Sequence, residues 1–368
     1  MIYLDYAANT PVDEEVLNEF VLATKKYIAN PNSSHPIGVE AREKIDECSN
    51  KIAQYFSCSK DSIIYTSGAS ESNNLVLKGI AEARCEFGNK IIISAVEHSS
   101  IVAPCNYLSS HGYDVEIIPL TKDGLVDLNV LKKEIDNQTI LVSICSVDSE
   151  LGTIQPIEEI AKIVKEHPNV IFHTDATQAI GKVKMNYDNV DFLTFAPHKF
   201  FGLNGSGVLV NRNNIKLIPL IHGGKSTTIF RSGTPVTANV IATSKALDLA
   251  INKLDERYNY VKKLNNKIRE ELSKYSCIHI NSPENAIPNT LNISLINKDT
   301  KDILKKLENE EIYLSTTTAC SLGNSPSKSV LAITNDSNLA SNTIRISMSH
   351  LTKESDIDKF LDIFKKML

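Results

Sequence analysis

Short apolar runs rich in β-branched residues alternate with helix-like segments through the first two thirds of the chain. The apolar runs lie at 62–65, 90–94, 115–120, 139–147, 170–175, 192–196 and 207–210. Between several of them, apolar residues recur with the period of an α-helix, at 71–86, 99–111, 128–136 and 157–166. Because strands that are apolar throughout need cover on both faces, this alternation predicts a mostly parallel sheet between layers of helices.

The pattern changes after Thr237. The elements expected beyond it are a long helical region, two shorter strands and a closing helix, at 238–274, 289–295, 343–348 and 353–367. They predict a smaller α+β unit that follows the main sheet. We therefore expect a large α/β domain over residues 16–237 and a small α+β domain formed by residues 1–15 and 238–368.

Charge and hydropathy restrict the partners that the chain is expected to bind. It is 42% hydrophobic and 23% charged, with a net charge of −5 and basic residues mixed among the acidic ones. This composition predicts no basic surface for nucleic acid or for an anionic membrane. The apolar runs are too short to span a bilayer, and the segment MIYLDYAANTP lacks the features of a signal peptide.

The seven cysteines are widely spaced and include no CxxC pair. Their odd number and their spacing argue against a disulfide framework and against a zinc site. A reducing compartment suits such a chain, so we expect a cytoplasmic protein without a bound metal.

Polar residues that follow the predicted strands are the candidates for a ligand site, because parallel sheets bind ligands at the carboxyl ends of their strands. The first candidate is TSGASESNN at 66–74, where a strand leads through small residues into a helix. Small side chains allow the backbone to approach a ligand closely, and the N–H groups of a helix start favour an anion. The alternative is an ordinary helix start capped by Ser70.

Asp175 and Lys199 follow two further predicted strands. A carboxylate at the end of an apolar strand needs a cationic partner, and the protonated pyridine nitrogen of pyridoxal phosphate (PLP) is one. A helix N-cap or a buried salt bridge is the alternative for Asp175. A lysine in a partly desolvated pocket has a lowered pKa and acts as an amine nucleophile, which is the functional interpretation of Lys199. The alternative is a solvated loop lysine.

Three further residues have side chains suited to catalysis or substrate binding. His98 follows the run at 90–94 and is suited to stacking on a flat ring or moving protons, with a capping or packed histidine as the alternative. Cys320 lies among small polar residues, which suits a reactive thiolate or an ordinary loop cysteine. Arg345 lies inside an apolar strand and needs a carboxylate, either from a substrate or from the protein.

The order and spacing of these motifs are more specific than any one of them. The chain resembles the cysteine desulfurases of the NifS/IscS type, within the class V aminotransferase group of fold-type I PLP enzymes. The resemblance extends over essentially the whole chain and includes YLDYAANTP, NPNSSHPIG, TSGASESNN, VEH, DATQ, HK, RSGT, PNTLNIS, AC and TIRIS. It implies the PLP-transferase fold, with a mostly parallel seven-stranded sheet in the large domain and a smaller C-terminal α+β domain.

The resemblance also implies how PLP is held. Lys199 would carry it as a Schiff base, Asp175 would pair with the pyridine nitrogen, and Gln178 would approach the ring oxygen. The other contacts implied within the chain are those of Ala69, Ser70, His98, Ser149 and His198. Thr234 would reach the phosphate of a neighbouring subunit, which implies a homodimer.

The implied reaction converts L-cysteine to L-alanine. Arg345 would bind the substrate α-carboxylate with help from residues near Asn30, while Lys199 and His98 would move protons. The thiolate of Cys320 would take the substrate sulfur as a persulfide and pass it to an acceptor protein.

Several positions around the cofactor depart from the family pattern and leave two alternatives open. Ser149 stands where the family has a ring-contacting Asn, and Ala196 stands where it has a hydroxyl residue. Pro197 lacks an N–H group, and Lys225 interrupts a glycine-rich segment. The alternatives are another PLP reaction, such as that of a selenocysteine lyase or a transaminase, and a degenerate sulfur-transfer scaffold.

Overall fold

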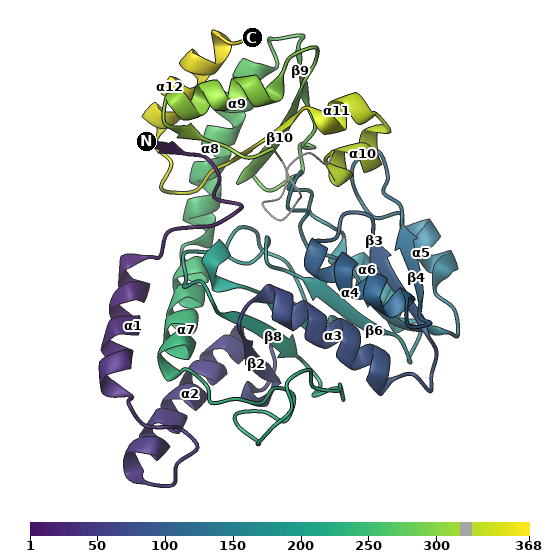
Figure 1. Ribbon diagram of the computed structural model, residues 1–368, viewed down its shortest axis with the longest axis vertical. Coiled ribbons are helices and arrows are strands. Elements are labelled where there is room, and N and C mark those ends of the chain that lie inside the picture. Colours follow the sequence, from purple (N-terminus) through teal and green to yellow (C-terminus); the bar gives the residue numbers. More distant parts are fainter. Residues whose placement is uncertain (317–325) are drawn as a thin grey trace.

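A seven-stranded sheet forms the centre of the computed structural model, which describes residues 1–316 and 326–368 (Figure 1). Its strands, in spatial order, are β2 (Ile63–Thr66), β8 (Gly207–Asn211), β7 (Phe192–Phe195), β6 (Ile171–Asp175), β5 (Thr139–Ser143), β3 (Lys90–Ser94) and β4 (Asp114–Ile118). The strands from β7 to β4 pair in parallel, and β8 runs antiparallel to both β7 and β2. The predicted mostly parallel seven-stranded sheet is therefore confirmed.

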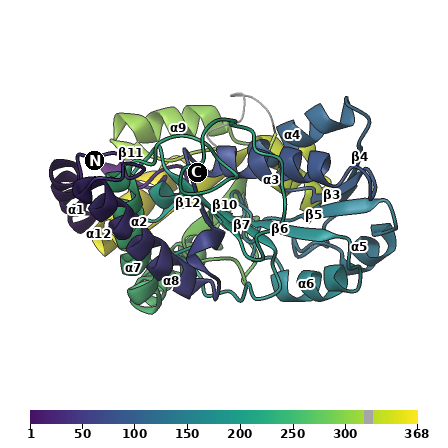
Figure 2. The same ribbon diagram turned by 90° about the horizontal axis from the view of Figure 1, so that it is seen from below.

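Helices cover both faces of this sheet, as the view in Figure 2 shows. On one face lie α3 (Ala69–Ala83) and α4 (Ser99–Ser109), and on the other lie α5 (Leu128–Glu134) and α6 (Ile157–Lys165). Successive strand residues point to opposite faces, so Ile91 and Ile93 of β3 pack in the core under α3 and α4, while Ile92 packs in the core under α6. Burial on both faces explains why the middle positions of β3 and β5 are apolar throughout, at 91–93 and 140–142.

Three further helices extend the side of the sheet formed by β2 and β8. They are α1 (Glu14–Lys26), α2 (Pro36–Tyr55) and α7 (Thr237–Asn252), and α7 packs against the other two. The helical region expected at 238–274 is two helices, because the chain turns at Lys253 before α8 (Leu254–Leu272). Side chains of α7 join the core of the large sheet, whereas those of α8 join a second core.

The second core belongs to a three-stranded antiparallel sheet near the C-terminus. Its strands are β12 (Thr343–Ser347), β10 (Thr290–Leu295) and β9 (Ile278–Ile280), and its helices include α8, α9 (Thr300–Asn309) and α12 (Glu354–Lys365). Two short helices, α10 (Lys328–Thr334) and α11 (Ser337–Ser341), lie beside it. The division into domains at residues 15 and 237 stays a prediction.

The N-terminal segment connects the two sheets. Strand β1 (Ile2–Tyr3) pairs in parallel with β11 (Ile312–Tyr313), beside the small sheet. The chain then reaches the large sheet, where the N–H of Thr10 donates to the carbonyl of His198 at 3.1 Å. Residues 4–9 therefore cross the space between the two cores. No helix among the described residues has the length and apolar character needed to cross a membrane.

Candidate active site

A cavity of about 390 Å³ lies at the carboxyl ends of the parallel strands, between the large sheet and β12. Its size is typical of a site for a small organic ligand. Nine of the residues expected to bind cofactor or substrate line it: Ala69, Ser70, His98, Ser149, Asp175, Gln178, His198, Lys199 and Arg345. Residues that are distant in the sequence meet here because adjacent parallel strands end at the same edge of a sheet.

The start of α3 forms one wall of the cavity. Its N-cap is Gly68, which has no side chain to cap the first turn, so the alternative prediction of a Ser70 cap is wrong. A Cβ added to Gly207 would lie 2.4 Å from the carbonyl carbon of Gly68, which shows how closely β8 approaches this turn. A helix start without a side-chain cap suits an anion such as a phosphate.

Asp175 ends β6 with its carboxylate buried at the cavity wall. One oxygen accepts from the N–H of Thr177 at 2.9 Å, and the other accepts from Nδ2 of Asn73 at 2.8 Å. The salt bridges among the described residues do not include Asp175, so its predicted alternative of a buried ion pair is not observed. A buried carboxylate with only neutral partners suits a ligand that carries a proton on nitrogen.

His98 is the N-cap of α4 and also faces the cavity. Its Nδ1 accepts from the N–H of Ser100 at 3.1 Å, which leaves the proton of the neutral ring on Nε2. Burial lowers the pKa of His98 below its usual value, and this favours the neutral ring. The Ser100 hydroxyl lies 2.8 Å from both His98 Nδ1 and Asn73 Nδ2, so a chain of polar contacts joins His98 to Asp175.

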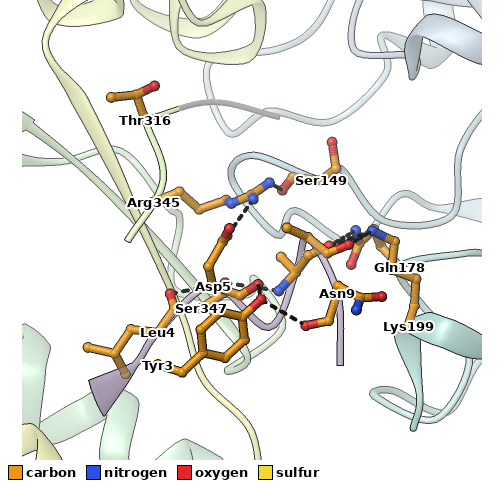
Figure 3. Close-up of polar contacts among 12 residues, drawn as sticks. Tyr3, Leu4, Asp5, Asn9, Ser149, Gln178, Lys199, Thr316, Arg345 and Ser347 are labelled. Carbon is orange, nitrogen blue, oxygen red and sulfur yellow. Dashed lines mark hydrogen bonds and ion pairs between the residues drawn. The ribbon is translucent and has the colours of Figure 1, made fainter. Parts of the chain in front are cut away.

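Lys199 follows β7 in a short 3₁₀ turn (Pro197–Lys199) and reaches the N-terminal segment. Its Nζ donates to the carbonyls of Ala7 at 2.8 Å and Ala8 at 2.5 Å (Figure 3). The Nε2 atom of Gln178 donates to the same Ala7 carbonyl at 3.0 Å. The neighbouring His198 has its pKa lowered to about 4, first by burial and then by the charges of nearby lysines, so its ring is neutral at neutral pH.

Arg345 projects from β12 and is almost completely buried. Its Nη2 pairs with Oδ1 of Asp5 at 2.9 Å, and its Nη1 donates to the carbonyl of Ser149 at 3.1 Å (Figure 3). Its Nε has no hydrogen-bond partner among the residues that the structure describes. The internal ion pair expected as one alternative is present, and the same side chain borders the cavity.

Two candidate residues, Thr234 and Asn30, do not line this cavity. Thr234 lines a second cavity, of about 240 Å³, together with Arg231. Asn30 is exposed, and its side-chain oxygen accepts from the N–H of Asn32 at 2.9 Å. Cys320 is outside the described residues.

Several contacts at the site involve residues that the sequence motifs did not identify as functional. Asn73 and Thr177 hold the Asp175 carboxylate, and Asp5 pairs with Arg345. Thr177 also lines the cavity, with its hydroxyl buried and unpartnered among the described residues. A signal for Asn73 exists in the sequence, because a polar residue on the buried face of a predicted helix needs a partner.

The residues that the structure describes contain no cluster of acidic, histidine or cysteine side chains suited to a metal ion.

Comparison with known proteins agrees with this architecture. Residues 2–360 match the family model described as Aminotransferase class-V. A cysteine desulfurase IscS of Dictyoglomus turgidum is 38% identical over an alignment that covers the whole of this chain and 94% of that protein. A structure described as a NifS-like protein superposes with a TM-score of 0.93 at 33% identity, covering 99% of this chain and 98% of that one.

A second solved structure, of SspA in complex with cysteine, superposes with a TM-score of 0.84 at 31% identity. The superposition covers 95% of this chain and 99% of that one. The family model matches almost the whole chain, and the identities to cysteine desulfurases extend over its full length. The chain belongs to the class-V aminotransferase family and, within it, to the cysteine desulfurases.

Proposed function

We propose that the chain uses PLP to convert L-cysteine to L-alanine and transfers the sulfur through Cys320. The observation that carries this proposal is that Lys199 and Asp175 line one cavity, with the buried Asp175 carboxylate held by neutral donors. An amine nucleophile and a carboxylate with room for a cationic partner are what a PLP ring requires from its site. The uncapped start of α3 in the same cavity suits its phosphate.

The residues of the cavity fit the parts of this cofactor. Lys199 would hold it covalently, and Asp175 would pair with the ring nitrogen. When bound, PLP supplies an electron sink for the bonds at the substrate α-carbon. The proposed ring contacts are those of His98, Ser149 and Gln178, and the proposed phosphate contacts are those of Ala69, Ser70 and His198.

The substrate would be oriented by its carboxylate. Arg345 lines the cavity with its Nε unpaired among the described residues, so it has a donor for the α-carboxylate of L-cysteine. The region of Asn30 would assist. Lys199 and His98 would move protons at the α- and β-carbons, and His98 would do so at Nε2, because Nδ1 is occupied by Ser100.

Sulfur transfer is assigned to Cys320. Its thiolate attacks the substrate sulfur, an S–S bond forms, and the C–S bond breaks with its electron pair remaining on carbon. That carbon takes a proton, and alanine leaves while Cys320 carries a persulfide. The outer sulfur then passes to a thiol of an acceptor protein.

The working unit is proposed to be a cytoplasmic homodimer with a large domain (16–237) and a small domain (1–15 and 238–368). Apolar side chains exposed on α1, on α2 and near Thr234 support pairing with a second copy; they include Leu17, Leu22, Ile37, Leu220, Ile229 and Val236. Thr234 lines a cavity separate from that of Lys199, which is compatible with a contact to the phosphate of a neighbouring subunit.

A comparison of two cysteine variants tests the proposed function. Cys320→Ala is expected to retain the visible absorbance of bound PLP but to lose alanine formation from L-cysteine. Cys58→Ala, at a partly buried cysteine that does not line the cavity, is the matched control and is expected to keep the activity. Normal turnover in Cys320→Ala, or a wild-type protein that takes up no PLP, would contradict the proposal.

A further inference from the structure

Lys182 is a buried lysine without an acidic partner among the described residues. It is 8% exposed and lies in the turn that follows β6, four residues after Gln178. Burial lowers the pKa of Lys182 well below its usual value, and the positive charges of Lys199 and Arg345 act in the same direction. Removing a lysine head group from water without a carboxylate partner costs stability, so packing alone does not account for this residue.

The contact that Lys182 makes points to a function at the cavity. Its Nζ donates to Oε1 of Gln178 at 2.5 Å, while Nε2 of Gln178 donates to the carbonyl of Ala7 at 3.0 Å. An amide side chain presents a donor at one end and an acceptor at the other, and its two orientations have almost the same shape. Lys182 donates to Oε1 and the Ala7 carbonyl accepts from Nε2, so only one of the two orientations satisfies both contacts.

The selected orientation determines what Gln178 offers to the cavity. Its amide nitrogen has two hydrogens, of which Ala7 takes one. Gln178 lines the cavity beside Asp175 and Lys199, and Figure 3 shows its side chain next to that of Lys199. The second N–H is therefore available to an acceptor on a group attached at Lys199.

We propose that Lys182 is a positioning residue that holds the Gln178 amide in the orientation that donates a hydrogen bond to an anionic oxygen of the group bound at Lys199. This inference rests on the proposed function, in which that group is PLP and the oxygen belongs to its ring. A donor to this oxygen stabilises its negative charge and thereby weakens proton binding at the adjacent Lys199 nitrogen. Loss of the donor strengthens proton binding there.

The test is a pH titration of the visible absorbance of the PLP-loaded protein without substrate. Lys182→Met is expected to move the midpoint upward by about one pH unit, equivalent to tenfold tighter proton binding. Lys184→Met is the matched control, because Lys184 is exposed and pairs with Asp255 at the surface. It is expected to leave the midpoint unchanged.

A double-mutant comparison separates positioning from a general effect of charge or packing. In a Gln178→Leu background, Lys182→Met is expected to cause no further shift, because the amide through which Lys182 acts is absent. An unchanged midpoint in Lys182→Met, or an equal shift in both backgrounds, would overturn the inference. Lys182→Ala provides the same comparison if the methionine variant does not fold.

The failure of the proposed function gives a different result. A wild-type protein that takes up no PLP would overturn the proposed function and this inference with it. A wild-type protein that binds PLP and titrates normally, with Lys182→Met titrating identically, would overturn the positioning role alone.

Discussion

Asp5 and Arg345 form an ion pair at 2.9 Å although 340 positions separate them in the sequence. Asp5 belongs to the N-terminal segment and forms a bridge with Ser347 of β12, while Arg345 also donates to the carbonyl of Ser149 after β5. Three separate parts of the chain therefore hold one guanidinium at the cavity. A substrate carboxylate would meet an arginine whose orientation is already fixed, so less conformational entropy is lost on binding.

The first prediction concerns the stability supplied by this pair. Asp5→Ala leaves a buried guanidinium without its carboxylate, so the free energy of unfolding is expected to fall by about 3 kcal/mol. Denaturant titration of the wild type and the variant measures the change.

The control for this prediction is an exposed pair, Asp255 and Lys184, whose side chains are 69% and 70% exposed. Asp255→Ala is expected to change the stability by less than about 1 kcal/mol, because solvent screens such a pair. If Asp5→Ala and Asp255→Ala lower the free energy of unfolding by the same amount, the buried ion pair contributes no more to stability than the exposed one, and the prediction is wrong.

The second prediction concerns substrate binding by Arg345. Arg345→Gln is expected to raise KM for L-cysteine about 10- to 100-fold, because a hydrogen bond between two charged groups contributes about 1.5–3 kcal/mol. The PLP absorbance is expected to remain. Steady-state kinetics with L-cysteine measure the effect, and Arg269→Gln is the control, since Arg269 bonds to Asn265 and Pro283 and does not line the cavity. A fall in kcat at constant KM would contradict the role of Arg345 in binding.

Most of the large sheet was predictable from the sequence, because strands such as β3, β5 and β8 are buried on both faces and carry runs of apolar residues. The short strands β1, β9 and β11 were not recognised, since a strand of two or three residues has too few positions for a periodic pattern. The break between α7 and α8 was also missed. Helical periodicity continues through Lys253, and the division arises because the two helices pack on different cores.

The candidate active site, too, was only partly predictable from the sequence. Asp175, Lys199, His98 and Arg345 were identifiable because each is a polar side chain after or within an apolar run. The contacts of Lys199 with Ala7 and Ala8 had no such signal, because they use backbone carbonyls that every residue has. Local patterns indicate which side chains face a ligand but not which distant backbone segment crosses the site.

The third prediction concerns the close approach of β8 to the start of α3. In Gly207→Ala the new Cβ would lie 2.4 Å from the carbonyl carbon of Gly68, which forces that turn to move. Because the turn is the proposed phosphate site, the affinity for PLP is expected to fall about tenfold, equivalent to about 1.4 kcal/mol. Titration of the apoprotein with PLP, followed by absorbance, measures this. A variant that loses stability but binds PLP with unchanged affinity would contradict the phosphate assignment.

The fourth prediction concerns Glu97, which is buried and next to His98 in the sequence. Its carboxylate accepts from the Ser94 hydroxyl at 2.6 Å and from the N–H of Cys145 at 2.8 Å.

Burial raises the pKa of Glu97 from 4.5 to about 8, with smaller contributions from Asp175 and Asp148. The folded protein therefore holds a proton on Glu97 that the unfolded chain releases above about pH 4.5. The stability due to Glu97 is therefore fully present below pH 4.5 and is lost as the pH rises towards 8, by at most about 1.4 kcal/mol per pH unit. Glu97→Gln removes this loss, so its stability relative to the wild type is expected to increase between pH 5 and pH 8 in denaturant titrations. A difference that stays constant over this pH range would mean that Glu97 is ionised in the folded protein.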